Sequence, residues 1–465
     1  MQVSRRLSGN GLVLAIFMMG LLMLYSTCAY GATIYVPDKY PTIQLGINAA
    51  VAGDVVIVRD NTYLLKAALD FKGKAITVKS EHGAGNCILD GQKKTRVVSF
   101  HSGEGSRSIL SGFTIRNGKA AKGGGIYCNS SSPTITDCTI TANKAYTNDA
   151  GYQYSYGGGI YCNAASPTIA NCLIQGNSAE AHSTNWDATS YGGGIHCDGG
   201  SPVITDCVVS GNTAVSVAYD SSSSYGGGIS GISSTPVITN STISNNSTSG
   251  GSSSLGGGMY FLSSNPSMVN CIINGNTANV GAGIFFSQSS SLTSLTNCTI
   301  VGNTGASLGG GIHCLTSSPS IVNSILWENS PVQISTAVAS FPVVSHSDVL
   351  GGYNGSGNID ANPLFVGIAK HDFHLTSTSP CIDVGDNTAP DLPDEDKDGD
   401  PRISHAIVDM GAYEFQWEGY SVSGTVTSGG AGVPGVAVKL TGTATKSSTT
   451  DNKGHYLFSG VDSGT

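Results

Sequence analysis

Charged side chains are scarce in this chain. Asp, Glu, Lys and Arg make up only 11% of its 465 residues, about half the usual share in a globular protein. A coiled coil is excluded, because such chains are rich in Glu, Lys and Arg. Basic residues (22) are outnumbered by acidic ones (31), which disfavours a nucleic-acid-binding protein. Hydrophobic residues still make up 39%, so we expect a folded chain.

Long apolar runs are also rare, and the one that occurs lies near the N-terminus. Two arginines precede the apolar residues 11–25, and small residues follow them. This order predicts a secretory signal peptide over residues 1–31, cleaved after Gly31. A membrane anchor is the alternative, but the run is short for a membrane span. We therefore expect an exported protein, secreted or held at the cell surface, which is monomeric and has no membrane span after cleavage.

Glycine, in contrast, is abundant and periodic. The sequence Gly-Gly-Gly-Ile or a close variant begins at Gly123, Gly157, Gly192, Gly226, Gly256, Gly281 and Gly309. Each unit continues with a short strand pattern, a Ser/Asn/Pro turn, a β-branched strand pattern and an Asn. The units resemble the coils of a right-handed parallel β-helix, an all-β solenoid in which stacking buries the apolar faces. We assign this solenoid to residues 32–345.

Asparagine and cysteine follow the same period. One Asn closes each unit, where stacked side chains can bond coil to coil: Asn143, Asn177, Asn212, Asn246, Asn276, Asn303 and Asn329. Cysteines fill a first-strand column (Cys128, Cys162, Cys197, Cys314) and a second-strand column (Cys138, Cys172, Cys207, Cys271, Cys298). We expect buried free thiols, because Phe and Ser replace Cys in these columns. Disulfides remain the alternative, since export would permit them.

Two N-terminal segments carry a family signature: Ile34-Tyr35-Val36-Pro37-Asp38, then Tyr40-Pro41-Thr42-Ile43-Gln44. With these segments and the repeats, residues 33–417 resemble the secreted β-helix proteins of the pectin-lyase-like superfamily. In that family the Pro-Thr-Ile-Gln segment starts a short helix over the open end of the stack. The resemblance therefore implies an N-terminal capping helix, which would shield strand edges and apolar core.

The C-terminal part carries two further resemblances. Asn358–Phe365 and Asp409–Glu414 are similar to the region that closes β-helix proteins with choice-of-anchor domains. This implies closing coils over residues 346–417, in a protein that is exported and often held at the cell surface. Residues 420–465 resemble the carboxypeptidase-regulatory-like β-sandwich. We expect this module to be incomplete, because a whole sandwich needs about 100 residues.

Catalytic motifs of enzymes in this superfamily are missing. The Gly-His-Gly motif of polygalacturonases and the Asp-Phe-Ile-Phe-Gly motif of pectin methylesterases do not occur. Asp137 and Asp206 stand where other units have Asn, so we interpret them as turn-ladder residues. His196 and His313 replace Tyr after a glycine triplet, and we expect them to face the surface. We therefore leave the catalytic residues unassigned.

An acidic segment offers a candidate calcium site. Asp394, Asp396, Asp398 and Asp400 place carboxylates at alternate positions, like the first half of a Ca²⁺ loop. His405, and not Glu, stands at the twelfth position, so the segment is not an EF-hand. A calcium site and a solvated acidic turn remain alternatives, and no cofactor is required by the functions considered below.

Three neighbouring coils carry long loops, which form the candidate ligand site. These loops run from Asn143 to Gly157, Asn177 to Gly192 and Asn212 to Gly226, and insertions in repeats often mark a binding face. Aromatic faces with nearby carboxylates suit sugar rings and their hydroxyls. The candidates are Tyr152, Tyr154, Tyr156, Trp186, Asp187, Tyr191, Tyr219, Asp220 and Tyr225. Tyr156, Tyr191 and Tyr225 each stand just before a glycine triplet and should stack on one another. Alternatively, the tyrosines cover a small core of the loops.

Three functions remain after this reading. We expect foremost a non-catalytic surface or extracellular protein that binds or adheres to an extracellular polysaccharide or cell-surface glycan. A carbohydrate-active enzyme of the polysaccharide lyase or epimerase type is the second hypothesis. A purely structural stalk is the third.

Overall fold

The computed structural model describes residues 31–251, 253–416, 420–441 and 445–461. The signal peptide predicted over residues 1–31 lies, apart from Gly31, outside these residues. No helix within the described ranges is long and apolar enough to cross a membrane.

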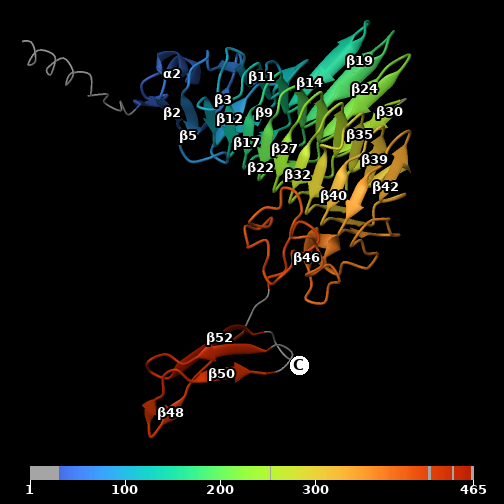
Figure 1. The fold of residues 1–465 in the computed structure, drawn as a ribbon. Coiled ribbons are helices and arrows are strands. Elements are labelled where there is room, and N and C mark those ends of the chain that lie inside the picture. Colours follow the sequence, from blue (N-terminus) through green and yellow to red (C-terminus); the bar gives the residue numbers. More distant parts are fainter. Residues whose placement is uncertain (1–30, 252, 417–419, 442–444, 462–465) are drawn as a thin grey trace, which may run out of the picture.

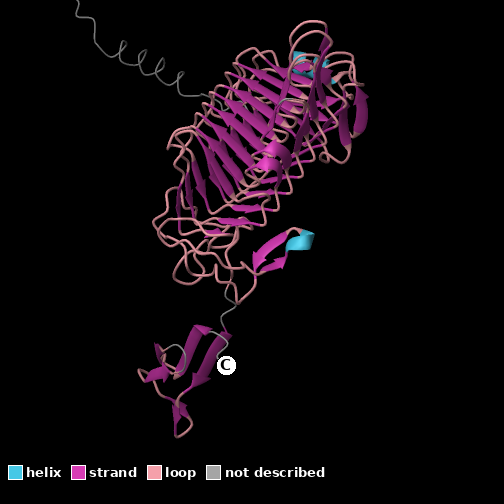
Figure 2. Ribbon diagram, turned by 90° about the vertical axis from the view of Figure 1, so that its right-hand side faces the viewer, coloured by secondary structure: helices cyan, strands magenta, loops and turns pink. Residues whose placement is uncertain are grey.

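The repeats fold into a parallel β-helix in which each coil between the two terminal ones gives one strand to each of three long sheets (Figures 1 and 2). Sheet A consists of β1 (Thr33–Val36), β2 (Val55–Val58), β5 (Thr77–Ser80), β8 (Ile109–Ser111), β12 (Thr134–Thr136), β17 (Thr168–Ala170), β22 (Val203–Thr205), β27 (Val237–Thr239), β32 (Ser267–Val269), β36 (Ser294–Thr296), β40 (Ser320–Val322) and β43 (Val343–Ser345).

Sheet B follows sheet A in each coil after a tight turn. Its strands are β3 (Asn61–Leu64), β6 (Cys87–Asp90), β9 (Thr114–Arg116), β13 (Thr139–Thr141), β18 (Leu173–Gln175), β23 (Val208–Ser210), β28 (Thr242–Ser244), β33 (Ile272–Asn274), β37 (Thr299–Val301), β41 (Ile325–Trp327) and β44 (Asp348–Val349).

Sheet C begins after the glycine triplets. Its strands are β4 (Leu69–Asp70), β7 (Val98–Phe100), β11 (Ile126–Asn129), β16 (Ile160–Asn163), β21 (Ile195–Asp198), β26 (Ile229–Ile232), β31 (Met259–Leu262), β35 (Ile284–Ser287), β39 (Ile312–Leu315) and β42 (Ile334–Ala337). All three sheets are parallel, as the repeats predicted.

The register places equivalent residues of successive coils side by side. In sheet C, for example, Ile126 pairs with Ile160 and Cys128 with Cys162. Alternate side chains point inward, so these columns form one continuous core along the solenoid. All eleven described cysteines are buried and free.

The asparagine ladder lies inside the molecule. The backbone N–H and the Nδ2 of Asn143 both donate to Oδ1 of Asn177 at 3.0 Å, and Asn177 repeats both bonds to Asn212. The pattern continues to Asn329, which bonds Gln333. Each Nδ2 also donates to a carbonyl of the preceding coil, such as Ile115. The prediction that stacked Asn side chains bond coil to coil is confirmed.

The two ends of the core are covered differently. At the N-terminal end, helix α2 (Ile43–Ala49) begins after Thr42, whose Oγ1 accepts a hydrogen bond from the Leu45 N–H. Ile43 and Ile47 enter the core, so the predicted capping helix is confirmed. At the other end, Tyr353 packs against the core beyond β44.

The segment after β44 differs from the expected closing coils. It contains β45 (Phe365–Gly367), the short 3-10 helix η1 (Ile368–Lys370) and β46 (Asp372–Leu375), and it folds back over the outer face of sheet B. Phe373 and Met410 pack there against Ile325 and Trp327. The buried Arg402 bonds Glu414 and also Asn270 of an earlier coil. The segment therefore covers a side of the solenoid instead of only extending it.

The C-terminal segment forms antiparallel pairs. Here β47 (Tyr420–Thr425) pairs with β52 (His455–Val461), β48 (Thr427–Ser428) with β49 (Ala431–Gly432), and β50 (Ala437–Leu440) with β51 (Lys446–Thr449). Its assignment as a carboxypeptidase-regulatory-like module stays a prediction.

Candidate functional site

The long loops form a projection of regular strands, which we call the fin. Its outgoing strands are β10 (Lys119–Ala120), β14 (Lys144–Asp149), β19 (Ser178–Ser183), β24 (Thr213–Val217), β29 (Ser247–Ser249), β34 (Thr277–Val280) and β38 (Thr304–Leu308). Its returning strands are β15 (Gln153–Tyr156), β20 (Ala188–Tyr191), β25 (Ser222–Tyr225) and β30 (Ser253–Leu255). In Figure 1, β14, β19 and β24 reach beyond the three long sheets. Each layer pairs in parallel with the same layer of the next loop.

Small side chains fill the space between the outgoing and returning layers. Ala145 and Ala179 are buried on the outgoing side, and Ser155 and Ser190 on the returning side. The Ser155 hydroxyl donates to the Glu180 carbonyl of the opposite layer at 2.6 Å. The interior of the loops is therefore made of Ala and Ser, and the tyrosines lie on the outside.

The three tyrosines before the glycine triplets form the predicted stack. Ring centroids are 5.4 Å apart between Tyr156 and Tyr191, and 5.0 Å apart between Tyr191 and Tyr225. The stack also lies against outward-facing rings of sheet C: Tyr156 is 5.6 Å from Tyr161 and 5.2 Å from His196. It thus joins the fin to sheet C.

This aromatic stack corrects the expectation that His196 and His313 face the surface. Both point away from the core, but neighbouring rings cover them, and His196 is fully buried. Its Nδ1 lies 2.6 Å from the Ser230 hydroxyl, and burial lowers its pKa to about 3. His313 lies against Phe285 and 2.7 Å from the Ser335 hydroxyl, and burial lowers its pKa as well.

A row of polar side chains lies on sheet C beside the fin. Parallel register aligns Asn129, Asn163 and Asp198 on successive strands. Nδ2 of Asn163 donates to Oδ1 of Asn129 at 2.6 Å. The Tyr161 hydroxyl lies 3.4 Å from both Oδ1 of Asn163 and Oδ2 of Asp198. Each member of the row is half-buried, so polar atoms are held in place yet reach solvent.

The fin tyrosines connect to this row through Tyr161, whose ring centroid lies 5.6 Å from that of Tyr156. Burial raises the pKa of Tyr156, and the nearby Tyr154 and Asp198 raise it further. Tyr154 is exposed, and its ring stacks on that of Tyr156 with centroids 6.3 Å apart. We call Asn129, Asn163 and Asp198 with Tyr154 and Tyr156 the polar corner. Its sheet C members were not among the residues predicted from the sequence, although the repeat that aligns them can be recognised there.

The tip of the fin carries a second aromatic group. The Tyr152 and Trp186 rings lie 5.2 Å apart, and Trp186 is 50% exposed. Tyr219, on the next loop, is 84% exposed. Asp187 is half-buried and Asp220 exposed at the same turns. The nine predicted residues therefore divide into a tip and a stack at the base, and they do not form one pocket.

Comparison with known protein families shows to which family this chain belongs. The family described as "Right handed beta helix region" matches residues 65–226 and 184–336, which together are more than half of the chain. The chain belongs to this right-handed β-helix family. No curated protein matches it. Among solved structures, this β-helix protein is similar to one described as "Crystal structure of pectate lyase Pel9A", with a TM-score of 0.46 and 14% identity over 80% of this chain and 90% of that chain.

The acidic segment of the β-helix protein forms a hydrogen-bonded turn. Oδ1 of the buried Asp396 accepts from the N–H groups of Asp398 and Asp400, and its Oδ2 accepts from the Glu414 N–H at 2.8 Å. Asp398 also lies 2.7 Å from Nε2 of His374. The four predicted calcium ligands, of which Asp394 is the first, do not form a close ligand group here. Calcium binding stays a prediction.

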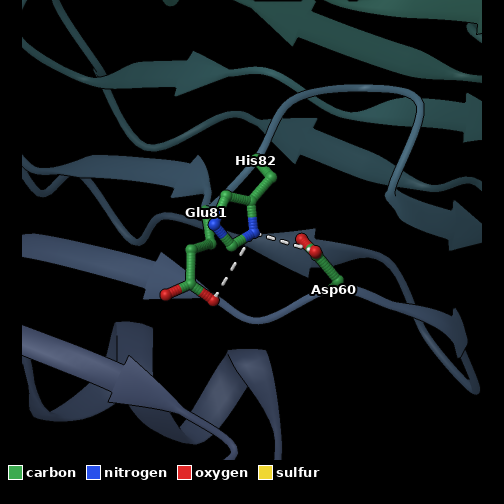
Figure 3. A group of neighbouring side chains, drawn as sticks. All are labelled: Asp60, Glu81 and His82. Atoms are coloured by element: carbon green, nitrogen blue, oxygen red, sulfur yellow. Dashed lines mark hydrogen bonds and ion pairs between the residues drawn. The ribbon is translucent and has the colours of Figure 1, made fainter.

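One group in the described part of the chain brings three potential metal ligands together: Asp60, Glu81 and His82 (Figure 3). Nδ1 of His82 lies 2.8 Å from Asp60 and 3.9 Å from Glu81. Arg59 already pairs with Glu81 and with Asp38. The arrangement is an ion-pair network at the surface of two early coils.

The remaining acidic candidates on the repeats are turn residues. Asp137 and Asp206 adopt left-handed backbone conformations at the turn between sheets A and B, and Asn171 between them does the same. Asn and Asp tolerate this conformation. Their interpretation as turn-ladder residues is confirmed.

Proposed function

We propose that this right-handed β-helix protein is exported and binds an extracellular glycan, without cleaving it, on the fin and the polar corner. The observation that carries the proposal is an aromatic stack that runs from the exposed Tyr154 through Tyr156 to Tyr161, whose hydroxyl lies at a row of hydrogen-bonding side chains. Tyr154 offers an exposed ring at one end of this stack, and Asn163 and Asp198 lie 3.4 Å from the Tyr161 hydroxyl at the other end. A sugar packs its apolar face on such a ring and bonds its hydroxyls to such a row.

The scaffold suits recognition of a polymer. The polar row lies on strands of a continuous parallel sheet, so its members repeat at the strand spacing of about 4.8 Å. Side chains on strands are held more rigidly than side chains on irregular loops. The tip rings of Tyr152, Trp186 and Tyr219 extend the aromatic surface outward along the fin.

The charges at the polar corner support binding over hydrolysis. Glycoside hydrolases need two carboxyl groups about 5–10 Å apart. Asp198 is the acidic member of its row, where its strand neighbours are Asn163 and Ile232. A lyase or epimerase remains the alternative, and product formation would reveal it.

The test is native electrophoresis of the protein in gels cast with individual polysaccharides, with and without Ca²⁺. We expect retardation in at least one gel without depolymerisation. Tyr154→Ala and Trp186→Ala should restore free mobility in that gel. The matched control is Phe341→Ala, which removes another exposed ring (73%) far along the chain and should leave retardation unchanged. A cleared band would make the protein an enzyme, and free mobility in every gel would favour the structural stalk.

A further inference from the structure

Positive charge is confined to parts of this chain. Between Lys144 and Lys370 the sequence contains neither Lys nor Arg, whereas the coils before Lys144 are rich in both. The protein as a whole is acidic. Lysines clustered in the first coils therefore form a locally positive region on a protein whose net charge is negative.

Three of these lysines line one pocket. Lys93, Lys119 and Lys144 surround a cavity of about 290 Å³, together with Asn143, Gly118 and Ser178. Lys119 and Lys144 occupy the same register position on β10 and β14, so the parallel pairing itself places them side by side.

The pocket lies on the opposite face of the fin from the polar corner. On the outgoing strands, Ala145 and Ala179 point into the fin, so Lys144 and Ser178 point away from the returning layer. On the returning strands, Ser155 is buried inside and the tyrosines before the glycine triplets face outward. The two surfaces are therefore separate.

A single carboxylate balances the three ammonium groups. Lys144 pairs with Glu180 at 2.5 Å. Within the described residues, neither Lys93 nor Lys119 makes an ion pair with an acidic side chain. The Tyr146 ring holds two of the cations, with its centroid 4.4 Å from Nζ of Lys119 and 4.6 Å from Nζ of Lys144. The repulsion that remains among the ammonium groups favours a bound anion.

We propose that this lysine pocket binds an oxyanion of an acidic glycan, a carboxylate or a sulfate ester, with Lys93, Lys119 and Lys144 as its charge partners. The oxygens of either group accept charge-assisted hydrogen bonds from ammonium groups. The assignment to a glycan rests on the proposed function, whereas the anion preference rests on the pocket alone. The protein would then bind sugar rings on one face of the fin and negatively charged groups on the other.

The test uses three polymers with one backbone: dextran, carboxymethyl-dextran and dextran sulfate, with inorganic sulfate as the free-anion probe. Binding is measured by affinity electrophoresis for wild type, the double variant Lys93→Gln/Lys119→Gln, and the control Lys79→Gln, an exposed lysine on β5 of sheet A. All three proteins are also run in polymer-free gels, so that the effect of each variant's altered charge on its mobility cancels. Thermal unfolding checks that each variant folds.

We expect at least one charged polymer to bind more tightly than dextran. The double variant should weaken that binding by about tenfold or more, corresponding to about 1.4 kcal/mol, and added salt should weaken it as well. Lys79→Gln should leave it unchanged. The proposal is overturned if charged polymers bind no better than dextran, or if Lys79→Gln weakens them as much as the double variant does.

Two outcomes separate this pocket from the polar corner. If Trp186→Ala and Tyr154→Ala change nothing but the lysine variant abolishes binding of charged polymer, the pocket stands and the proposed function of the polar corner fails. If inorganic sulfate binds in a lysine-dependent way and no charged polymer does, the glycan assignment of the pocket is overturned in favour of a free anion.

Discussion

The rings of Tyr156 and Tyr191 lie almost parallel, with centroids 5.4 Å and planes 4° apart. They belong to different coils, and the pairing of β15 with β20 sets their spacing. Because the same rings lie against His196 of sheet C, the stack fixes the angle between the fin and the solenoid. The proposed glycan surface is therefore built on packed strands.

The stack should contribute measurably to stability. Tyr191→Ala removes contacts with Tyr156, Tyr225 and His196, and we expect it to lower the free energy of unfolding by about 2–4 kcal/mol. Urea denaturation measures the change. Tyr219→Ala, at the exposed tip, should cost less than about 0.5 kcal/mol. Equal losses for the two variants would show that the stack does not hold the fin.

The buried asparagine ladder gives a second prediction. Asn177 accepts two hydrogen bonds from Asn143, and its Nδ2 donates to Asn212 and the Ile140 carbonyl. Asn177→Ala leaves these groups without partners, and we expect a loss of about 2–4 kcal/mol in the free energy of unfolding. The exposed Asn148→Ala serves as the control. A stable Asn177→Ala protein would contradict the role of the ladder.

The burial of His196 leads us to predict that the stability of the protein depends on pH. Its pKa is about 3 in the folded protein because burial, helped by the nearby Lys122, disfavours the charged ring, against an ordinary value of 6.5. The folded state thus binds fewer protons than the unfolded state between these values. The stability that the neutral His196 gives the folded protein is complete above pH 6.5. It is lost as the pH falls toward 3, by up to about 1.4 kcal/mol of unfolding free energy per pH unit.

The measurement is the difference in unfolding free energy between wild type and His196→Gln from pH 7.5 to pH 4.5. The difference should shift in favour of His196→Gln as the pH falls, since the other titrating groups are common to both proteins. A difference that does not change with pH would mean that His196 is accessible to protons in the folded state.

Much of the solenoid could be predicted from the sequence because each coil repeats the same sequence pattern. The glycine triplets, the Asn143 column and the alternating strands recur in one order, and stacking turns that order into sheets. The capping helix over Ile43–Ala49 was likewise predicted, since its segment carries a family signature.

The fin could not be predicted, because its strands lack the usual strand residues. Segments such as Ser222–Tyr225 are rich in Ser and suggest a loop, yet they form strands by pairing with the loop of the next coil. Strand formation there depends on neighbours and not on local propensity. The burial of His196 was missed for a similar reason, because Tyr156 and Tyr161, which cover it together with Tyr191, come from the preceding coil.

The fold-back of the C-terminal segment depends on contacts between distant residues. Arg402 reaches Asn270, and Asn297 donates to the Asp409 carbonyl. No local sequence pattern predicts contacts between residues so far apart in the chain. The polar corner is intermediate: its row on sheet C follows from the repeat, but its link to Tyr154 through the rings of Tyr161 and Tyr156 depends on how the fin folds.

The claim that glycan binds on the fin is tested most directly by tryptophan fluorescence. Trp186 is half exposed at the tip, whereas Trp327 is buried against the C-terminal segment. Titration with the polysaccharide that most retards the protein should give a saturable blue shift in emission, because a bound sugar ring excludes water from the Trp186 indole. We predict that Trp186→Phe abolishes this shift. A shift that persists unchanged in Trp186→Phe, or retardation without any shift, would contradict binding at the tip.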